Sequence, residues 1–91
     1  MELDELKELI GKNLKDLRKK SFSRKHSSRR LSQDELVLTL EMSPAHLRKI
    51  ERGSGNPTLE TLCNFANYFG VSVVYFLTEH SEEGNEGREK R

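Results

Sequence analysis

The stretch LSQDELVLTLEMSPAHLRKIERGSGNPTLETL, residues 31–62, decides the fold of this chain. Its first part predicts a short helix. Ser32 suits the N-cap position and Glu35 lies three residues further on, so the two residues form a predicted capping box. The helix runs to about Leu40, with Leu36 and Leu40 facing inward.

A second short helix follows after a turn at 41–42. Ser43 is the next N-cap residue, and Pro44 sits at the first helical position, where its missing N–H is of no consequence. This helix runs to about Arg52 and stops at Gly53. Two short helices joined by such a turn, the second opening with a capping serine, form a helix-turn-helix.

Three further helices complete the predicted fold. The first covers 1–20, where leucine and isoleucine recur at three- and four-residue steps along one face. Gly11 weakens its middle by roughly 1 kcal/mol relative to alanine. A helix over 59–69 and a short last helix that ends near Leu77 follow the helix-turn-helix. We therefore expect one compact all-α domain of five helices over 1–78.

Composition supports a single small domain and excludes several classes of protein. Of the 91 residues, 33% are hydrophobic and 34% charged, and the charged end of the chain, 79–91, is expected to be disordered. The longest apolar stretch, 71–77, is far short of the ~20 residues of a membrane-spanning helix, and no secretory signal opens the chain. The single cysteine, Cys63, excludes a disulfide within the chain and points to the cytoplasm; we expect it to be packed.

Charge is concentrated in one block. Nine basic residues and a single acid between Lys12 and Arg30 give that stretch a net charge of +8, although the whole chain carries only +1. The end of the chain, 78–91, has three basic and five acidic residues, a net charge of −2. A basic block in a nearly neutral chain indicates a polyanionic partner on one face, and a solvated run of charge is the alternative.

The chain resembles the Cro/repressor-type family of helix-turn-helix proteins, also called XRE-type or lambda-repressor-like, of bacterial and phage regulators. The resemblance covers roughly 10–78 and rests on five motifs in this order: IGKNLKDLR (10–18), LSQDEL (31–36), MSPAHLRKIERG (42–53), NPTLETL (56–62) and FGVSVVYFL (69–77). It implies a domain of five helices that binds double-stranded DNA.

The helix over 44–52 has two distinct sides. Leu47 and Ile50 point to one side and dock on the preceding helix. The opposite arc is free to enter a major groove. Its members are Ala45, Lys49 and Arg52, with Arg48 beside them. The resemblance implies that the base-facing residues are Pro44, Ala45 and Lys49, with His46 at the edge of the arc.

Other residues suit the DNA backbone. Gln33 matches the phosphate-binding glutamine of the family, and Ser43 opens a helix whose backbone N–H groups can face a phosphate. Arg48 and Arg52 are the charged candidates. An ordinary solvated helix face is the alternative for these cations and for Lys49.

The resemblance also implies an ion pair between Arg18 and Glu51 that fixes the recognition helix against the first helix. Two positions depart from the family pattern. Val37 stands where alanine is usual, which implies a slightly wider crossing of the two motif helices. Glu41 stands where glycine is usual, so a positive φ there would strain the backbone.

The third departure is a basic insertion over 21–31, between the first and second helices. Its sequence SFSRKHSSRR has no periodicity and predicts a mobile loop. One interpretation is an arm along the DNA backbone, in which Arg24, Lys25, Arg29 and Arg30 neutralise phosphates. The other is a solvated loop whose charge aids solubility.

We expect a homodimer. Val74 or Tyr75 in the last helix is left exposed, and the long first helix offers Leu3, Leu6 and Leu9 as a second contact. A symmetric dimer would match an inverted-repeat operator. The function expected is therefore that of a repressor-like transcriptional regulator. The alternative is a protein-interaction module or antitoxin-like partner protein that keeps the fold and binds DNA only non-specifically.

No chemistry of another kind is predicted. The histidines His26, His46 and His80 and the single cysteine lack metal-ligand spacing, and no cofactor motif is present. No nucleophile has a base and an orienting partner, so we do not expect an enzyme.

Overall fold

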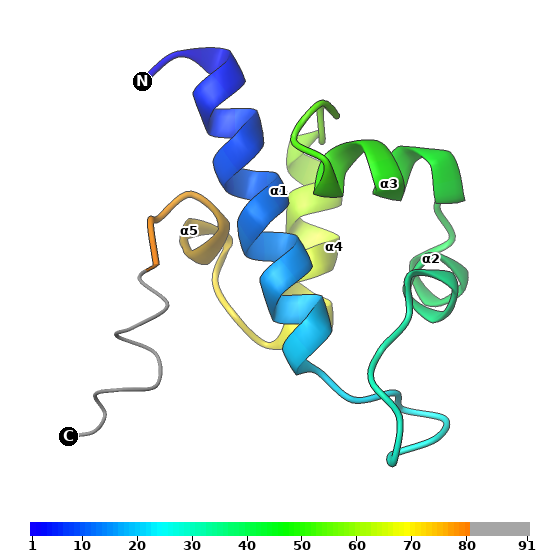
Figure 1. The fold of residues 1–91 in the computed structure, drawn as a ribbon. Helices are drawn as coiled ribbons and strands as arrows, with labels where there is room; N and C mark the ends of the chain where they lie inside the picture. The colour runs from blue at the N-terminus through cyan, green and yellow to red at the C-terminus, as the bar shows by residue number, and fades with distance from the viewer. Residues whose placement is uncertain (81–91) are drawn as a thin grey trace, which may run out of the picture.

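The computed structural model describes residues 1–80. They form five helices, α1 (Leu3–Lys20), α2 (Gln33–Leu40), α3 (Pro44–Glu51), α4 (Leu59–Phe69) and α5 (Val73–Phe76), shown in Figure 1. The described residues contain no strand beyond one isolated β-bridge. This architecture confirms the predicted all-α class and the position of each expected helix.

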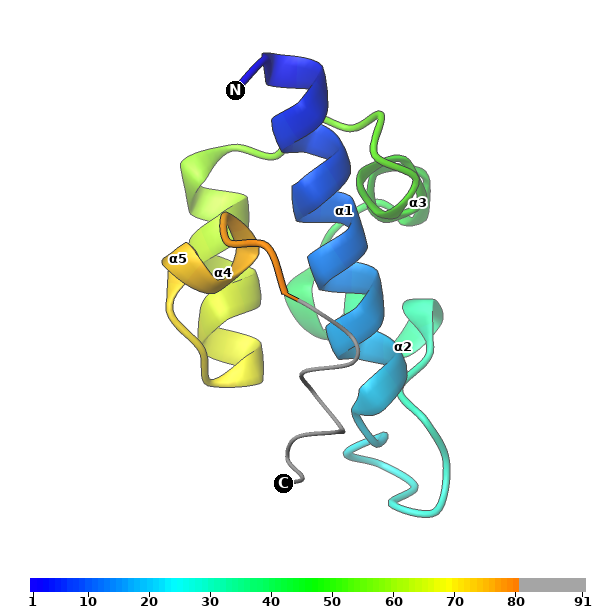
Figure 2. The same cartoon turned by 60° about the vertical axis from the view of Figure 1, so that its left-hand side comes forward.

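Helix α1 is the central element. It contacts α3 on one side and α5 on the other, and α4 packs against α5 (Figures 1 and 2). The predicted weak point Gly11 has a packing reason, because a Cβ there would collide with the backbone carbonyl of Ile50 at the end of α3. Only glycine lets these two helices approach so closely.

The core fills the space between the helices. Its fully buried members include Leu14 from α1, Leu36 from α2, Leu47 from α3, Phe65 from α4 and Phe76 from α5. Each helix thus supplies at least one side chain, and burying a residue of this size stabilises the fold by roughly 1.5–3 kcal/mol.

Helix α4 buries one face against the core. Leu62 and Phe65 point inward, and Tyr68 is buried as well, to 8% exposure. The prediction that Cys63 is packed was wrong, since this thiol is exposed. The buried face of α4 includes residues 62, 65 and 66. Residue 63 is rotated by about 100° from residue 62 around the helix axis, so it points away from this face.

The turn between α2 and α3 has the predicted strain. Glu41 adopts φ 56 and ψ 47, the left-handed region that normally favours glycine. Its N–H donates to a carbonyl of α2 and ends that helix. Val37, the other departure, is 7% exposed within the core, so the larger side chain is accommodated.

The basic insertion forms a hairpin over 21–31, where the sequence predicted a loop without regular structure. Phe22 and Arg30 form an antiparallel β-bridge. The N–H of Leu31 donates to the carbonyl of Ser21 at 2.9 Å, and that of Ser23 donates to Arg29 at 2.8 Å. This backbone pairing leaves no hydrophobic periodicity in the sequence, so the sequence analysis did not predict it.

The predicted capping box at the start of α2 is only half formed. Ser32 Oγ accepts a hydrogen bond from the Glu35 N–H at 3.0 Å, as expected. The Glu35 carboxylate does not return to the cap and instead accepts the Arg24 N–H at 2.9 Å. The Ser23 hydroxyl, followed by backbone N–H groups of the hairpin, lowers the pKa of Glu35 below its usual 4.5. This carboxylate therefore fastens the hairpin to α2.

A buried amide fixes α5 on α1. Asn13 is 2% exposed, and its side chain donates to the carbonyls of Phe76 at 3.0 Å and Thr78 at 2.8 Å. His80 stacks on the Tyr75 ring with the ring centroids 4.1 Å apart. His80, from the start of the predicted tail, thus contacts α5, and the rest of that tail, 81–91, lies outside the described residues.

Candidate nucleic-acid interface

Helix α3 has the two-sided surface that the sequence predicted. Leu47 and Ile50 are 0% and 1% exposed and hold the helix against the core. Lys49 is exposed on the other side, together with Pro44, Ala45, Arg48 and Arg52. His46 is half-buried. The exposed arc combines small and cationic side chains, which suits close approach to a polyanion.

The start of α3 carries a hydroxyl group that can donate to an anion. Ser43 is the N-cap residue, and its Oγ accepts the His46 N–H at 3.1 Å. Pro44 occupies the first helical turn. Since a hydroxyl both donates and accepts, the Ser43 O–H remains able to donate to an anion. The partial positive charge of the helix start adds to this preference.

Arg18 and Glu51 form the expected ion pair between α1 and α3. Arg18 Nε donates to Glu51 Oε2 at 2.7 Å, and Nη2 donates to Oε1 at 3.0 Å. The two side chains are 12% and 3% exposed. Arg18 Nη1 also donates to the carbonyl of Leu31 at 3.0 Å, a partner that the sequence did not reveal. The pair therefore joins α1, α3 and the end of the hairpin.

Gln33 couples α2 to this pair. Its Nε2 donates to Glu51 Oε1 at 2.8 Å, so the side chain expected at a phosphate is oriented by the buried carboxylate. An amide nitrogen carries two N–H donors, which leaves one for a second acceptor.

A cationic cavity of about 270 Å³ opens at the junction of α1, α2 and α3. Four cations and a single carboxylate give it a net charge of +3; its lining residues are Lys15, Arg18, Gln33, Arg48, Glu51 and Arg52. Lys15 was missed at the level of sequence, although it lies three residues before Arg18 on α1 and so shares its face. The cavity has the charge and size for a phosphate group.

The hairpin cations take different positions. Arg24 was expected at a phosphate, but its guanidinium lies 3.8 Å from the centroid of the Tyr68 ring and donates to the Tyr68 carbonyl. Arg30 covers the Phe22 ring at 4.4 Å and donates to Lys20 at 3.3 Å. Arg29 is exposed. Two of these three exposed arginines therefore stack on aromatic rings of the fold.

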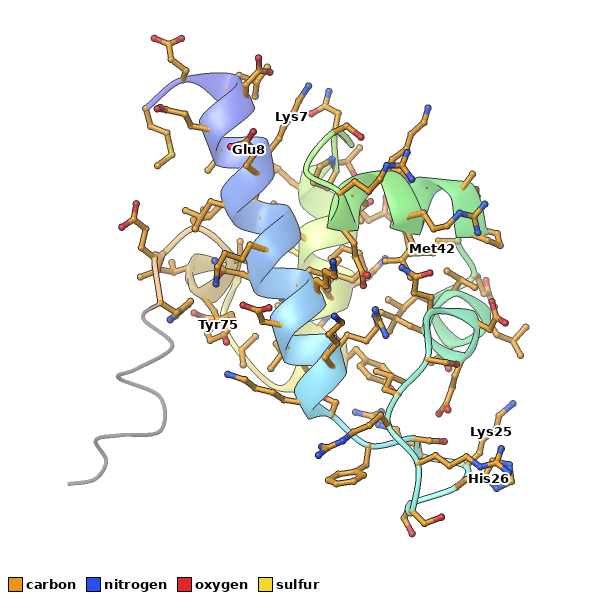
Figure 3. The ribbon with its side chains drawn as sticks, viewed as in Figure 1. Lys7, Glu8, Lys25, His26, Met42 and Tyr75 are labelled. Atoms are coloured by element: carbon orange, nitrogen blue, oxygen red, sulfur yellow. The ribbon has the colours of Figure 1, made fainter. Side chains whose placement is uncertain are left out.

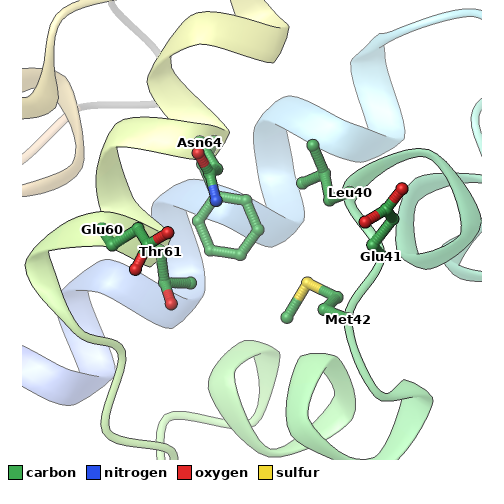
Figure 4. A pocket seen from close by; sticks show the side chains of 7 residues that line it. Leu40, Glu41, Met42, Glu60, Thr61 and Asn64 are labelled. Carbon is green, nitrogen blue, oxygen red and sulfur yellow. The ribbon is translucent and has the colours of Figure 1, made fainter.

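A second cavity, of about 350 Å³, lies between the α2–α3 turn and α4 (Figure 4). Leu40, Met42 and Phe65 form its apolar part, while Glu41 and Glu60 supply carboxylates. Two acids without a lining cation repel phosphate. The cavity that suits a polyanion and the cavity that repels one therefore lie on different parts of the helix-turn-helix.

Within residues 1–80, no cluster of histidine, cysteine or acidic side chains could hold a metal ion. None of the helices in that part of the chain is long and apolar enough to cross a membrane.

The fold and this surface define a helix-turn-helix protein. The family model described as Helix-turn-helix matches residues 24–76. The chain is 32% identical over 78 residues to an uncharacterized HTH-type transcriptional regulator, y4dJ, of Sinorhizobium fredii (strain NBRC 101917 / NGR234), and the match covers 86% of this chain and 91% of that protein. No solved structure matches the chain significantly. The chain belongs to the helix-turn-helix family, which confirms the Cro/repressor-type resemblance of its sequence.

Proposed function

We propose that this protein is a sequence-specific, duplex-DNA-binding transcriptional regulator that acts as a homodimeric repressor. The observation that carries the proposal is the surface of α3. Its apolar side is buried in the core, while Ala45 and Lys49 stand exposed on the side that a major groove would receive. The small residues at the start of this cationic arc allow the protein backbone of α3 to approach the bases closely.

The base-reading residues proposed are Pro44, Ala45, His46 and Lys49. Lys49 can donate to guanine O6 and N7, and Ala45 can pack on a thymine methyl group. Half-buried His46 lies at the edge of this surface. The similarity of the chain to an HTH-type transcriptional regulator supports this use of the helix.

The phosphate-binding residues proposed surround the base-reading ones. Gln33, Arg48 and Arg52 line the cationic cavity, and Ser43 lies at the start of α3. A backbone phosphate seated in this cavity would fix the register of α3 in the groove, because phosphate contacts position a protein and carry no sequence information.

The dimer proposed uses α5. Val74 is 64% exposed and Leu77 40%, so the short helix presents apolar surface to solvent. Tyr75 beside them is half-buried. Two copies joined through this surface would place two recognition helices on one operator, with half-sites about one helical turn apart.

A protein-interaction module or antitoxin-like partner protein is the second candidate. The observation that favours it is exposed apolar surface away from α3: Leu38 is 67% and Leu59 79% exposed. Single exposed leucines are common on soluble proteins, which makes this observation weaker than the surface of α3.

In vitro selection from a random duplex pool tests the proposal. The expected result is enrichment of an inverted repeat. Lys49→Ala should then relax the preference at one base pair of each half-site by about 1–3 kcal/mol. Lys12→Ala is the control, since Lys12 pairs with Asp16 on α1, outside the cationic cavity. Retention without enrichment would leave only non-specific binding, and no retention would favour the second candidate.

A further inference from the structure

The hairpin over 21–31 is a preformed part of the domain. Leu31 at its base is 1% exposed, and Ser23 is 5% exposed. Ser23 Oγ accepts the N–H groups of Lys25 at 3.1 Å and His26 at 2.9 Å, which shapes the turn. A segment held this way pays little conformational entropy when it meets a ligand.

Two contacts hold the hairpin against other helices. Arg24 stacks over Tyr68 at 3.8 Å and so reaches α4. The Glu35 carboxylate accepts the Arg24 N–H at 2.9 Å and so reaches α2. Arg24 and Glu35 thus hold the hairpin in place, and the hairpin tip over 25–29 takes no part in these two contacts.

The tip is cationic and points away from the body of the domain. Lys25, His26 and Arg29 are all exposed, and no carboxylate lies within the tip itself. Figure 3 shows Lys25 and His26 extending outward from the end of the hairpin. The carboxylate of Glu35, at the base of the tip, interacts with the charge of Lys25 and accepts the Arg24 N–H.

The hairpin continues the surface of α3 and α2. In Figure 2, α3, the start of α2 and the hairpin follow one another down the same side of the molecule. Arg29 is four residues before Gln33, so the chain places it within about 14 Å of that residue. Phosphates follow one another along each DNA strand, so a surface of this length can meet more than one of them.

We propose that the hairpin tip is a second DNA-binding site, in which Lys25 and Arg29 bind backbone phosphates beyond the base pairs read by α3. This inference rests on the proposed function and extends it. The tip lies beyond the recognition helix along the DNA backbone, so we assign it no role in reading bases. It therefore lengthens the DNA footprint and raises affinity without changing the preferred sequence.

The test compares wild type with Lys25→Ala/Arg29→Ala on the selected operator over a range of salt. Two lost phosphate contacts should reduce the magnitude of the negative slope of log K against log salt by about 1.8. Base preference in a repeated selection should stay unchanged. Ser27→Ala/Ser28→Ala is the matched control in the same tip, and Lys12→Ala removes one charge from α1; both should keep the wild-type slope apart from weak long-range effects.

A series of duplexes shortened from each end locates the contact. Wild-type affinity should fall when the flank under the tip is removed, and the affinity of Lys25→Ala/Arg29→Ala should not. An unchanged slope and equal flank dependence in wild type and variant would overturn the second site while leaving operator reading intact. Loss of enrichment by the wild type would instead overturn the proposed function, and the slope on random duplex would still decide whether the tip binds phosphate. Wild type that retains no duplex at all would overturn both.

Discussion

Glu51 shows how a single buried residue organises the candidate interface. Its carboxylate accepts two hydrogen bonds from Arg18 and one from Gln33. The three residues come from three different helices, so the carboxylate sets the relative position of all of them. An acid on the proposed DNA-binding helix is tolerated because these donors neutralise and cover it.

The Arg18–Glu51 pair gives the residue-scale prediction. Arg18→Ala or Glu51→Ala alone should lower the free energy of unfolding by about 3–5 kcal/mol, because the remaining charge is stranded in a buried site. The double variant should lose clearly less than the sum of the two single losses. Urea denaturation of the four proteins measures the coupling energy.

The control for this cycle is Arg18→Ala combined with Leu59→Ala, since Leu59 is 79% exposed at the start of α4. That combination should be additive within about 0.5 kcal/mol. If the free-energy losses of Arg18→Ala and Glu51→Ala also add up in their double variant, the ion pair contributes no coupling energy.

Some residue-level features were predictable and others were not. The left-handed conformation of Glu41 follows from its place in the turn, and capping by Ser43 and Thr58 follows from local sequence. The contact of Arg24 with Tyr68 joins residues that are 44 positions apart. No periodicity or spacing links such a pair, so only the folded chain shows it.

At the scale of elements, the hairpin is the main addition to the fold of five helices. The five helices were predictable because apolar spacing and caps are written in adjacent residues. The hairpin depends instead on where α1, α2 and α4 leave room for it. Its attachment to α2 passes through the Glu35 carboxylate, which the sequence assigned to a local capping box.

That attachment makes the hairpin sensitive to acid. The pKa of Glu35 is lowered in the folded protein, mainly by the Ser23 hydroxyl, from the usual 4.5. The attachment is therefore complete above about pH 4.5 and is lost as the pH falls through the lowered pKa of the folded state. The amide exchange rate of Arg24, measured by NMR after correction for intrinsic exchange, should rise over that acidic range.

Glu35→Gln supplies the control for the acid effect. An amide cannot titrate, so its exchange at Arg24 should be independent of pH over the same range once intrinsic exchange is removed. The amides that donate within α4 should keep their protection in both proteins. Identical pH dependence in wild type and variant would contradict the attachment.

At the scale of the whole molecule, the proposed DNA-binding surface and the proposed dimer surface lie on different sides. The cationic cavity and α3 lie across α1 from α5, whose exposed Val74 and Leu77 form apolar surface (Figure 1). A protein that binds DNA with α3 therefore leaves α5 free to meet a second copy. Asn13, which binds the carbonyls at the end of α5, keeps that surface in a defined position.

The whole-molecule prediction concerns the proposed dimer. Val74→Asp should give a monomeric mass by light scattering at micromolar concentration, because two aspartates would face one another across the symmetric contact. Val74 is 64% exposed, so the monomer itself should stay folded. The matched control is Leu59→Asp, which is 79% exposed on α4 and should stay dimeric. Affinity for a single half-site should be equal in wild type and Val74→Asp, while affinity for the full inverted repeat should fall in the variant. A monomeric wild type would contradict the proposed dimer. A dimeric Val74→Asp protein would show that the two copies meet through a different surface.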